Sequence, residues 1–80
     1  SADDRNANRA RRLTFKEKKE FEQLEKDLEA LNKEKADIEA ALCGGTTSVD
    51  EITRMSKRLP ELNDEIDEKE MRWLELREFA

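Results

Sequence analysis

The chain has 80 residues, of which 46% are charged and 35% are hydrophobic, and its formal net charge at pH 7 is -5. A chain this short buries a small share of its surface, so we expect a single domain. It has no histidine, no tyrosine and one cysteine, which excludes most catalytic and metal-binding arrangements. Two glycines and one proline argue against a turn-rich β fold, whereas abundant Glu, Lys, Leu and Ala are typical of long helices. We therefore expect a non-catalytic, all-α chain without a cofactor or metal of its own.

The sequence predicts neither a membrane segment nor a secretory signal. Its apolar runs are a few residues long, whereas a spanning helix needs about 20, and no apolar stretch follows Ser1. Cys43 has no second cysteine with which to form a disulfide within the chain, which favours a reducing compartment. We interpret this thiol as incidental and predict a cytoplasmic location with no membrane partner.

Residues 1–12 show no hydrophobic period, and we interpret them as a flexible basic arm or linker. The first helix is expected over about residues 15–43, because Thr14 and Glu17 have the spacing of a capping box. The a and d positions of a heptad repeat then hold Phe21, Leu24, Leu28, Leu31, Lys35, Ile38 and Leu42.

Gly44 is the predicted left-handed residue that ends this helix. Ser48 and Glu51 form a second capping box, so a second helix is expected over about residues 49–79. Its a and d positions hold Ile52, Met55, Leu59, Leu62, Ile66, Lys69, Trp73 and Leu76. Pro60 lies at an outward position, where it predicts a kink or a short break near residues 58–60.

Two matching stripes joined by a short loop predict a two-helix antiparallel coiled-coil hairpin over residues 13–80. Facing residues in such a hairpin have a constant index sum, and a sum of 90 places an a position opposite a d position in every layer. It pairs Leu28 with Leu62, Leu24 with Ile66 and Ile38 with Ile52. It also places Lys69 over Phe21, with a cation–π contact, and Glu17 opposite Trp73.

Positive charge is concentrated near the start of the chain. Residues 1–20 carry seven basic and four acidic groups, a net charge of +3, whereas residues 21–80 have a net charge of -8. Basic residues also recur every seven positions on the outward face of the first helix: Arg12, Lys19, Lys26 and Lys33. Such a ridge can neutralise phosphates without reading base sequence. The alternative is an ordinary face of solvated lysines. The candidate nucleic-acid-binding residues are Arg9, Arg11, Arg12, Lys16, Lys18, Lys19 and Lys26.

Apolar and aromatic residues gather at the predicted open end of the hairpin: Phe15, Trp73, Leu76 and Phe79. They are interpreted as a plug that prevents fraying. The alternative is an interaction patch for another domain or for a second copy of the chain in a homodimer.

Two segments resemble a known family. Residues 12–17 read Arg-Leu-Thr-Phe-Lys-Glu and residues 72–76 read Arg-Trp-Leu-Glu-Leu. They are similar to the opening and the close of the C-terminal domain of Uup-type ABC-F ATPases. The chain departs from that pattern at Phe15, where the family has an aromatic hydroxyl, at Pro60, and in its short glycine loop.

The resemblance implies a parent protein with two upstream ATP-binding cassettes, which would use ATP and Mg²⁺, and no transmembrane part. It also implies DNA binding by this domain, whereas other ABC-F proteins act on the ribosome and its RNA. The residues that it favours for this contact are Arg11, Arg12, Lys16, Lys18 and Lys19. We therefore expect an accessory nucleic-acid-binding domain, with a protein-interaction or dimerisation coiled coil as the alternative.

Overall fold

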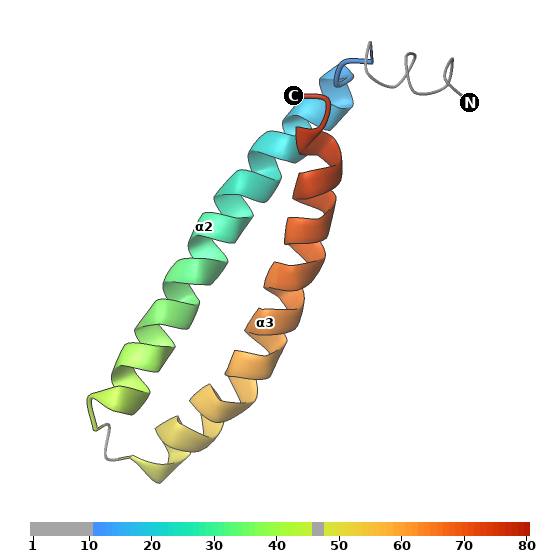
Figure 1. The fold of residues 1–80 in the computed structure, drawn as a ribbon. Helices are drawn as coiled ribbons and strands as arrows, with labels where there is room; N and C mark the ends of the chain where they lie inside the picture. Colours follow the sequence, from blue (N-terminus) through green and yellow to red (C-terminus); the bar gives the residue numbers. More distant parts are fainter. Residues whose placement is uncertain (1–10, 46–47) are drawn as a thin grey trace.

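The computed structural model describes residues 11–45 and 48–80, and these form a helical hairpin. Helix α2 spans Phe15–Cys43 and helix α3 spans Val49–Arg77. The two helices lie antiparallel (Figure 1) in a shape of 60 × 24 × 16 Å. The described residues contain no strand. The predicted all-α hairpin is therefore confirmed. Most of the predicted arm, residues 1–10, lies outside the described residues.

Both helices begin where their capping residues predict. The Thr14 hydroxyl accepts a hydrogen bond from the Glu17 N–H at 3.1 Å, and the Glu17 carboxylate accepts one from the Thr14 N–H at 3.0 Å. At the second helix, the Ser48 hydroxyl accepts from the Glu51 N–H at 3.3 Å. These contacts satisfy N–H groups that have no partner within the helix.

Helix α2 ends at Cys43 as predicted, whereas the left-handed residue and the end of α3 differ from the predictions by one or two residues. Gly44 caps α2 with φ -78°, and the left-handed residue is Gly45, with φ 79°. Glycine is still required at position 44, because a Cβ there would lie 2.9 Å from the Ala40 carbonyl oxygen. Helix α3 ends at Arg77 rather than at residue 79. Beyond it, the Phe79 and Ala80 N–H groups donate to carbonyls three residues earlier, which tightens the last turn.

The buried side chains follow the predicted heptad stripes. On the two helices they are Leu24, Ile38, Leu62, Ile66 and Leu76, and Leu62 has no exposed surface. Leu13, which precedes α2, is also buried and forms one cluster with Leu24 and Leu76. Phe21, Trp73 and Phe79 pack against this cluster, so the open end of the hairpin has a core of its own.

The contacts between the helices differ from those predicted by the index sum of 90. Phe21 stacks on Trp73 with 5.8 Å between ring centroids, whereas Lys69 donates to Asp27 at 3.2 Å. The predicted contacts of Lys69 with Phe21 and of Glu17 with Trp73 are therefore wrong. The index sums of these observed pairs are 94 and 96. Side chains on both helices lean toward their own N-termini, so in an antiparallel pair the tips that touch belong to residues with a larger index sum.

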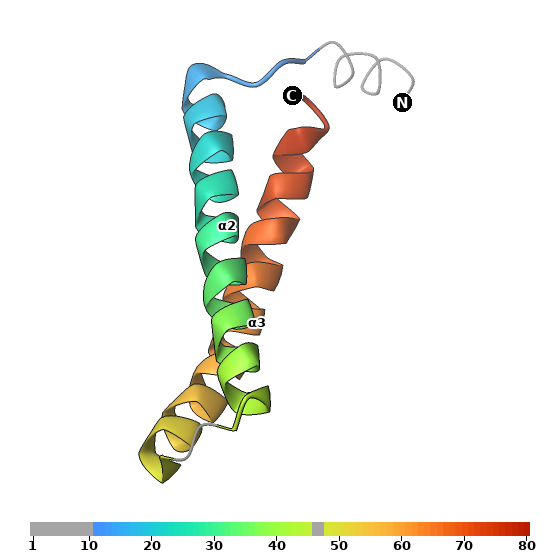
Figure 2. The ribbon, with the colours of Figure 1, turned by 90° about the vertical axis from the view of Figure 1, so that its left-hand side faces the viewer.

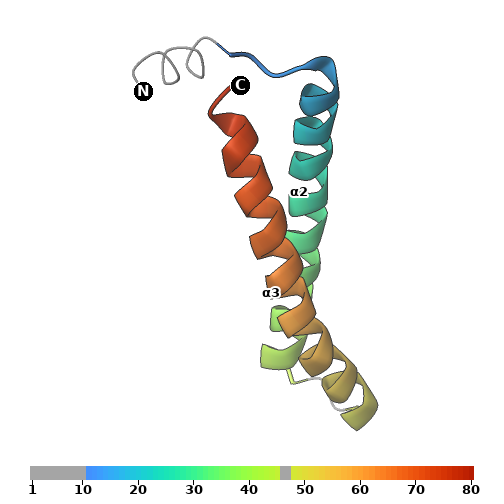
Figure 3. The same ribbon diagram turned by 90° about the vertical axis from the view of Figure 1, so that its right-hand side faces the viewer.

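The loop end of the hairpin is less tightly packed than the open end. Helix α3 begins beyond the last turn of α2 (Figures 2 and 3). Ile52 is accordingly 39% exposed and Val49 is 74% exposed, although Ile38 is buried. The predicted Ile38–Ile52 layer is therefore incomplete, because Ile52 leans toward the loop and away from Ile38.

Pro60 lies inside α3 and does not interrupt it. The helix is continuous over residues 49–77, so the predicted short break is absent. Proline has no N–H to donate to the Ser56 carbonyl, and its ring crowds the preceding turn. Because Pro60 is exposed, the freed carbonyl lies on the solvent side of the helix.

Ion pairs cross the seam between the helices on one side. Arg58 donates from Nε and Nη2 to the two Glu34 oxygens at 2.7 and 3.1 Å, and Arg72 binds Glu20 in the same way at 2.8 and 2.9 Å. The hydrogen bonds from Arg58 and Arg72 lower the pKa of the Glu34 and Glu20 carboxyl groups below the ordinary value of 4.5. Both arginines have raised pKa values, chiefly because of these same bonds.

These pKa shifts predict a pH-dependent contribution to stability. A carboxyl group whose pKa is lowered by folding stabilises the folded state fully above its ordinary pKa, and this contribution is lost as the pH falls through the lowered value. We expect Glu34→Gln to lower the melting temperature most at pH 7, and the difference from wild type to shrink below about pH 4.5. Glu29→Gln, at an exposed position, is the control. A Glu34→Gln difference that stays constant from pH 7 to pH 3 would contradict the role of this pair.

Candidate nucleic-acid interface

Net positive charge is concentrated at the start of α2 and in the residues just before it. Residues 11–19 contain five basic groups and one acidic group, a net charge of +4, whereas residues 20–80 contain nine basic and eighteen acidic groups, a net charge of -9. Arg11, also exposed, forms an ion pair with Glu17; the other four cations are Arg12, Lys16, Lys18 and Lys19, all exposed, and we call them the basic turn. The fold places it at the open end of the hairpin (Figure 1).

The basic turn is built by the N-cap of α2. Because the capping box fixes the backbone from Thr14 to Glu17, the side chains of Lys16 and Lys19 lie one turn apart on the same helix face. Arg12 lies before the helix, so it does not continue the predicted ridge with helical spacing. An array of exposed cations of this kind can contact phosphates without reading the base sequence.

Around the rest of the predicted ridge, carboxylates on the same helix offset the charge of the lysines. Lys26 is exposed, but Glu22 and Glu29 lie one turn away on either side and Glu25 precedes it. Lys33 is 3.9 Å from Asp37. A polyanion lying along these turns would meet carboxylates together with the lysines, so the favourable region ends near Lys19.

Arg11 has a structural contact that the sequence analysis did not predict. Its guanidinium forms an ion pair with Glu17 and lies 4.4 Å from the centroid of the Phe79 ring. The hydrogen bond from the Thr14 N–H is the main cause of the lowered pKa of Glu17, and the hydrogen bond from Arg11 is the second. Residues 11–14 thus extend from α2 toward the C-terminal end of α3 (Figure 2). Because its charge is paired, Arg11 is a weaker candidate for phosphate contact than the basic turn. Arg9 lies outside the described residues.

Phe15 belongs with the basic turn rather than with the predicted interaction patch. It is the first residue of α2 and is 75% exposed. The Lys19 ammonium lies 5.1 Å from the centroid of its ring. Phe15 is not among the residues that pack against the core cluster at the open end.

The other members of the predicted patch, Trp73, Leu76 and Phe79, make contacts within the hairpin. Leu76 is 1% exposed and is part of the core. Trp73 stacks on Phe21, and the Arg77 guanidinium lies 5.1 Å from its ring centroid. Phe79 is half-buried beneath Arg11. These contacts fit the interpretation as a plug that joins the two helices at the open end.

Two exposed apolar residues on α3 were missed by the sequence analysis. Met71 is 67% exposed and Leu74 is 54% exposed. Leu74 also lines an open groove between the helices with Leu28, Glu70 and Trp73. Both residues fall outside the a and d positions, and this departure from the heptad pattern is the signal that could have identified them.

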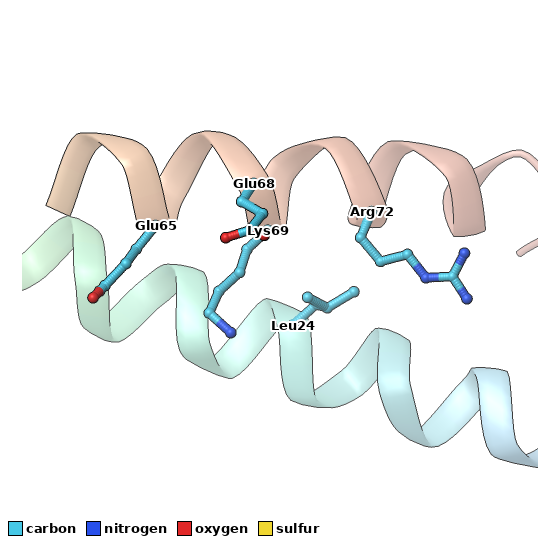
Figure 4. Close-up of a pocket in the computed structure, with 5 residues that line it drawn as sticks. All are labelled: Leu24, Glu65, Glu68, Lys69 and Arg72. Atoms are coloured by element: carbon cyan, nitrogen blue, oxygen red, sulfur yellow. The ribbon is translucent and has the colours of Figure 1, made fainter. Parts of the chain in front are cut away.

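A second depression lies on the opposite side of the seam, around Leu24 (Figure 4). Its polar rim includes Lys69 and Arg72, and both are bound to carboxylates of α2. This depression is therefore a part of the interface between the helices, and both of its cations are already paired.

Comparison with known proteins identifies a family for most of the chain. A family model described as ABC transporter C-terminal domain matches residues 12–78. Comparisons with curated proteins and with solved structures gave no significant match. Within residues 11–45 and 48–80, neither helix is sufficiently long and apolar to cross a membrane.

Proposed function

Because the chain belongs to the ABC transporter C-terminal domain family, we propose that it is the accessory domain of a Uup-type ABC-F ATPase and binds nucleic acid through the basic turn. In this proposal residues 1–12 connect the hairpin to upstream ATP-binding cassettes. ATP and Mg²⁺ would bind those cassettes, and the hairpin itself would supply no catalytic group. The proposed location is the cytoplasm, where DNA and ribosomal RNA are both accessible.

The contrast in charge within the chain is the observation that carries this proposal. A polyanion is attracted to residues 11–19, with a net charge of +4, and repelled by residues 20–80, with a net charge of -9. Since Glu17 is paired with Arg11, the four cations of the basic turn are available to phosphates. The acidic body would then orient the hairpin so that its open end approaches the nucleic acid.

Charge reversal in the basic turn is expected to abolish binding. Four phosphate contacts predict a slope of about -3 to -4 for log K against log salt concentration on duplex DNA, or roughly a 100-fold loss between 50 and 200 mM salt. Lys16→Glu/Lys19→Glu removes two of these contacts and adds repulsion. Fluorescence anisotropy with a labelled 20-base-pair duplex and with an RNA of the same length measures the effect.

The matched control is Lys26→Glu/Lys33→Glu, which makes the same change in net charge on the same helix. We expect it to weaken binding much less, because these lysines already lie among carboxylates. Circular dichroism checks the fold of both variants; a glutamate at position 16, in the first helical turn, is compatible with the helix dipole. Equal effects of the two double variants, or binding independent of salt, would contradict the proposal.

A protein-interaction or dimerisation function has one observation in its favour. Met71, Leu74 and the groove beside Trp73 expose apolar surface on α3. Leu74→Glu tests this better than Trp73→Ala, because Trp73 also packs against the core. Light scattering that gives a dimer for wild type and a monomer for Leu74→Glu would favour this alternative.

A further inference from the structure

We infer that Phe15 is a stacking platform for an unpaired nucleobase, so that the hairpin prefers single-stranded nucleic acid to a blunt duplex. The inference rests on the proposed function, because it assigns a substrate class to the same basic turn. It is carried by three observations on the described residues: the ring is exposed, it lies among cations, and it is not among the side chains that pack against the core cluster.

The exposure of Phe15 is not explained by the fold. Its ring is 75% exposed, whereas Phe21, the next aromatic residue of α2, stacks on Trp73. One exposed apolar residue is ordinary on a protein surface. What distinguishes Phe15 is its surroundings, because Lys16, Lys18 and Lys19 follow it within one turn. An aromatic face beside a row of cations is the arrangement by which proteins bind single strands.

The backbone that carries the ring is fixed. Phe15 follows Thr14, whose N–H and hydroxyl are both engaged by Glu17, so the backbone at the start of the helix is fixed. The Lys19 ammonium lies 5.1 Å from the ring centroid. A base stacked on the accessible part of the ring would bring its own phosphates close to Lys16 and Lys19.

Charge complementarity favours a nucleobase over an apolar protein surface as the occupant. Covering Phe15 with a protein side chain would take the neighbouring lysines partly out of water without a partner for their charge. A nucleotide supplies both the aromatic face and the phosphates that pair with these lysines. Bases within a duplex are already stacked on each other, so an unpaired base or a strand end is needed to offer a free face.

Val49 provides a matched control within the chain. It is the first residue of α3 as Phe15 is of α2, it follows a capping serine, and it is 74% exposed. Its neighbours Asp50 and Glu51 are acidic. The variants Phe15→Ala and Val49→Ala therefore remove an exposed side chain from equivalent positions, one inside the basic turn and one far from it.

The experiment measures binding of a ten-nucleotide single strand and of a blunt ten-base-pair duplex by anisotropy. The single strand contains 2-aminopurine, whose fluorescence falls when it stacks. We expect wild type and Val49→Ala to quench this base and to prefer the single strand. Phe15→Ala should bind the single strand about tenfold more weakly, with no quenching and an unchanged salt slope. Phe15→Trp, unlike Phe15→Ala, should keep both the binding and the quenching, because it retains an aromatic ring at this position.

The outcomes separate this inference from the proposed function. If wild type binds both nucleic acids with a steep salt dependence, but Phe15→Ala changes neither affinity nor quenching, the stacking role is wrong and the proposed function stands. If wild type binds neither, the proposed function fails and this inference fails with it. Circular dichroism of Phe15→Ala verifies that a loss of binding does not come from unfolding.

Discussion

Replacing Leu62 with alanine is expected to lower the free energy of unfolding by about 3 kcal/mol, which is a large part of the stability of so small a chain. Leu62 has no exposed surface, and it lies on the seam near the middle of α3. Truncating this side chain removes buried apolar area and leaves a cavity. The hairpin has few other core side chains that could move to fill it. The core is small, with six buried hydrophobic residues among the described ones.

Thermal unfolding followed by circular dichroism at 222 nm tests this expectation. For a chain of this length, 3 kcal/mol corresponds to a fall of about 12–24 °C in the melting temperature. Met71→Ala is the control, because Met71 is 67% exposed on the same helix and should change the melting temperature little. Similar melting temperatures for Leu62→Ala and Met71→Ala would mean that the hairpin is not held together at this seam.

Replacing Pro60 with alanine is expected to stabilise the hairpin by about 2 kcal/mol. Proline in a helix interior costs about 3 kcal/mol relative to alanine, because the N–H is missing and the ring crowds the preceding turn. Proline also restricts the unfolded chain, which offsets up to about 1 kcal/mol of this gain. Pro60 is exposed and α3 is continuous through it, so alanine fits without a change in packing.

The melting temperature of Pro60→Ala should accordingly rise by about 8–16 °C. Glu61→Ala, at the next exposed position, is a control for the general effect of alanine on this helix. A lower melting temperature for Pro60→Ala would show that the local helix geometry imposed by proline is needed for the packing of α3 on α2.

The sequence predicted those parts of the fold that depend on local chemistry and on periodicity. The capping box of Thr14 and Glu17 depends on two residues three positions apart, and it forms as predicted. The buried positions follow from the heptad pattern, since every buried residue within the two helices lies on a predicted stripe. Leu62 is fully buried, as its place on the stripe predicts. Its pairing with Leu28 stays a prediction.

The contacts that the sequence did not predict depend on the direction and length of side chains. An index sum aligns backbone positions, but Phe21 and Trp73 meet because each side chain leans toward the start of its own helix. Similarly, Lys69 extends to Asp27 instead of covering Phe21. Gly44 and Gly45 are both compatible with a left-handed turn, and the spacing of the sequence does not show that the positive φ falls at Gly45.

The candidate site was predicted in composition but not in arrangement. Charge counting located the basic segment, yet it treated Arg11 as equivalent to Lys16, although Arg11 is bound to Glu17 and Phe79. The contact with Phe79 joins residues that are far apart in the chain, so no local pattern could indicate it. Phe15 was grouped with Trp73 because both are aromatic and near the open end, whereas burial separates them.

The most direct test of binding through the basic turn is to locate nucleic acid on the hairpin by NMR. The amide resonances of the ¹⁵N-labelled chain are followed while a single-stranded oligonucleotide is added at low salt. Binding at the basic turn predicts shifts confined to residues 12–19 and their neighbours at the end of α3, with the amides around Lys26, Lys33 and the loop unchanged. Shifts centred on Met71 and Leu74, or spread evenly along α2, would contradict it.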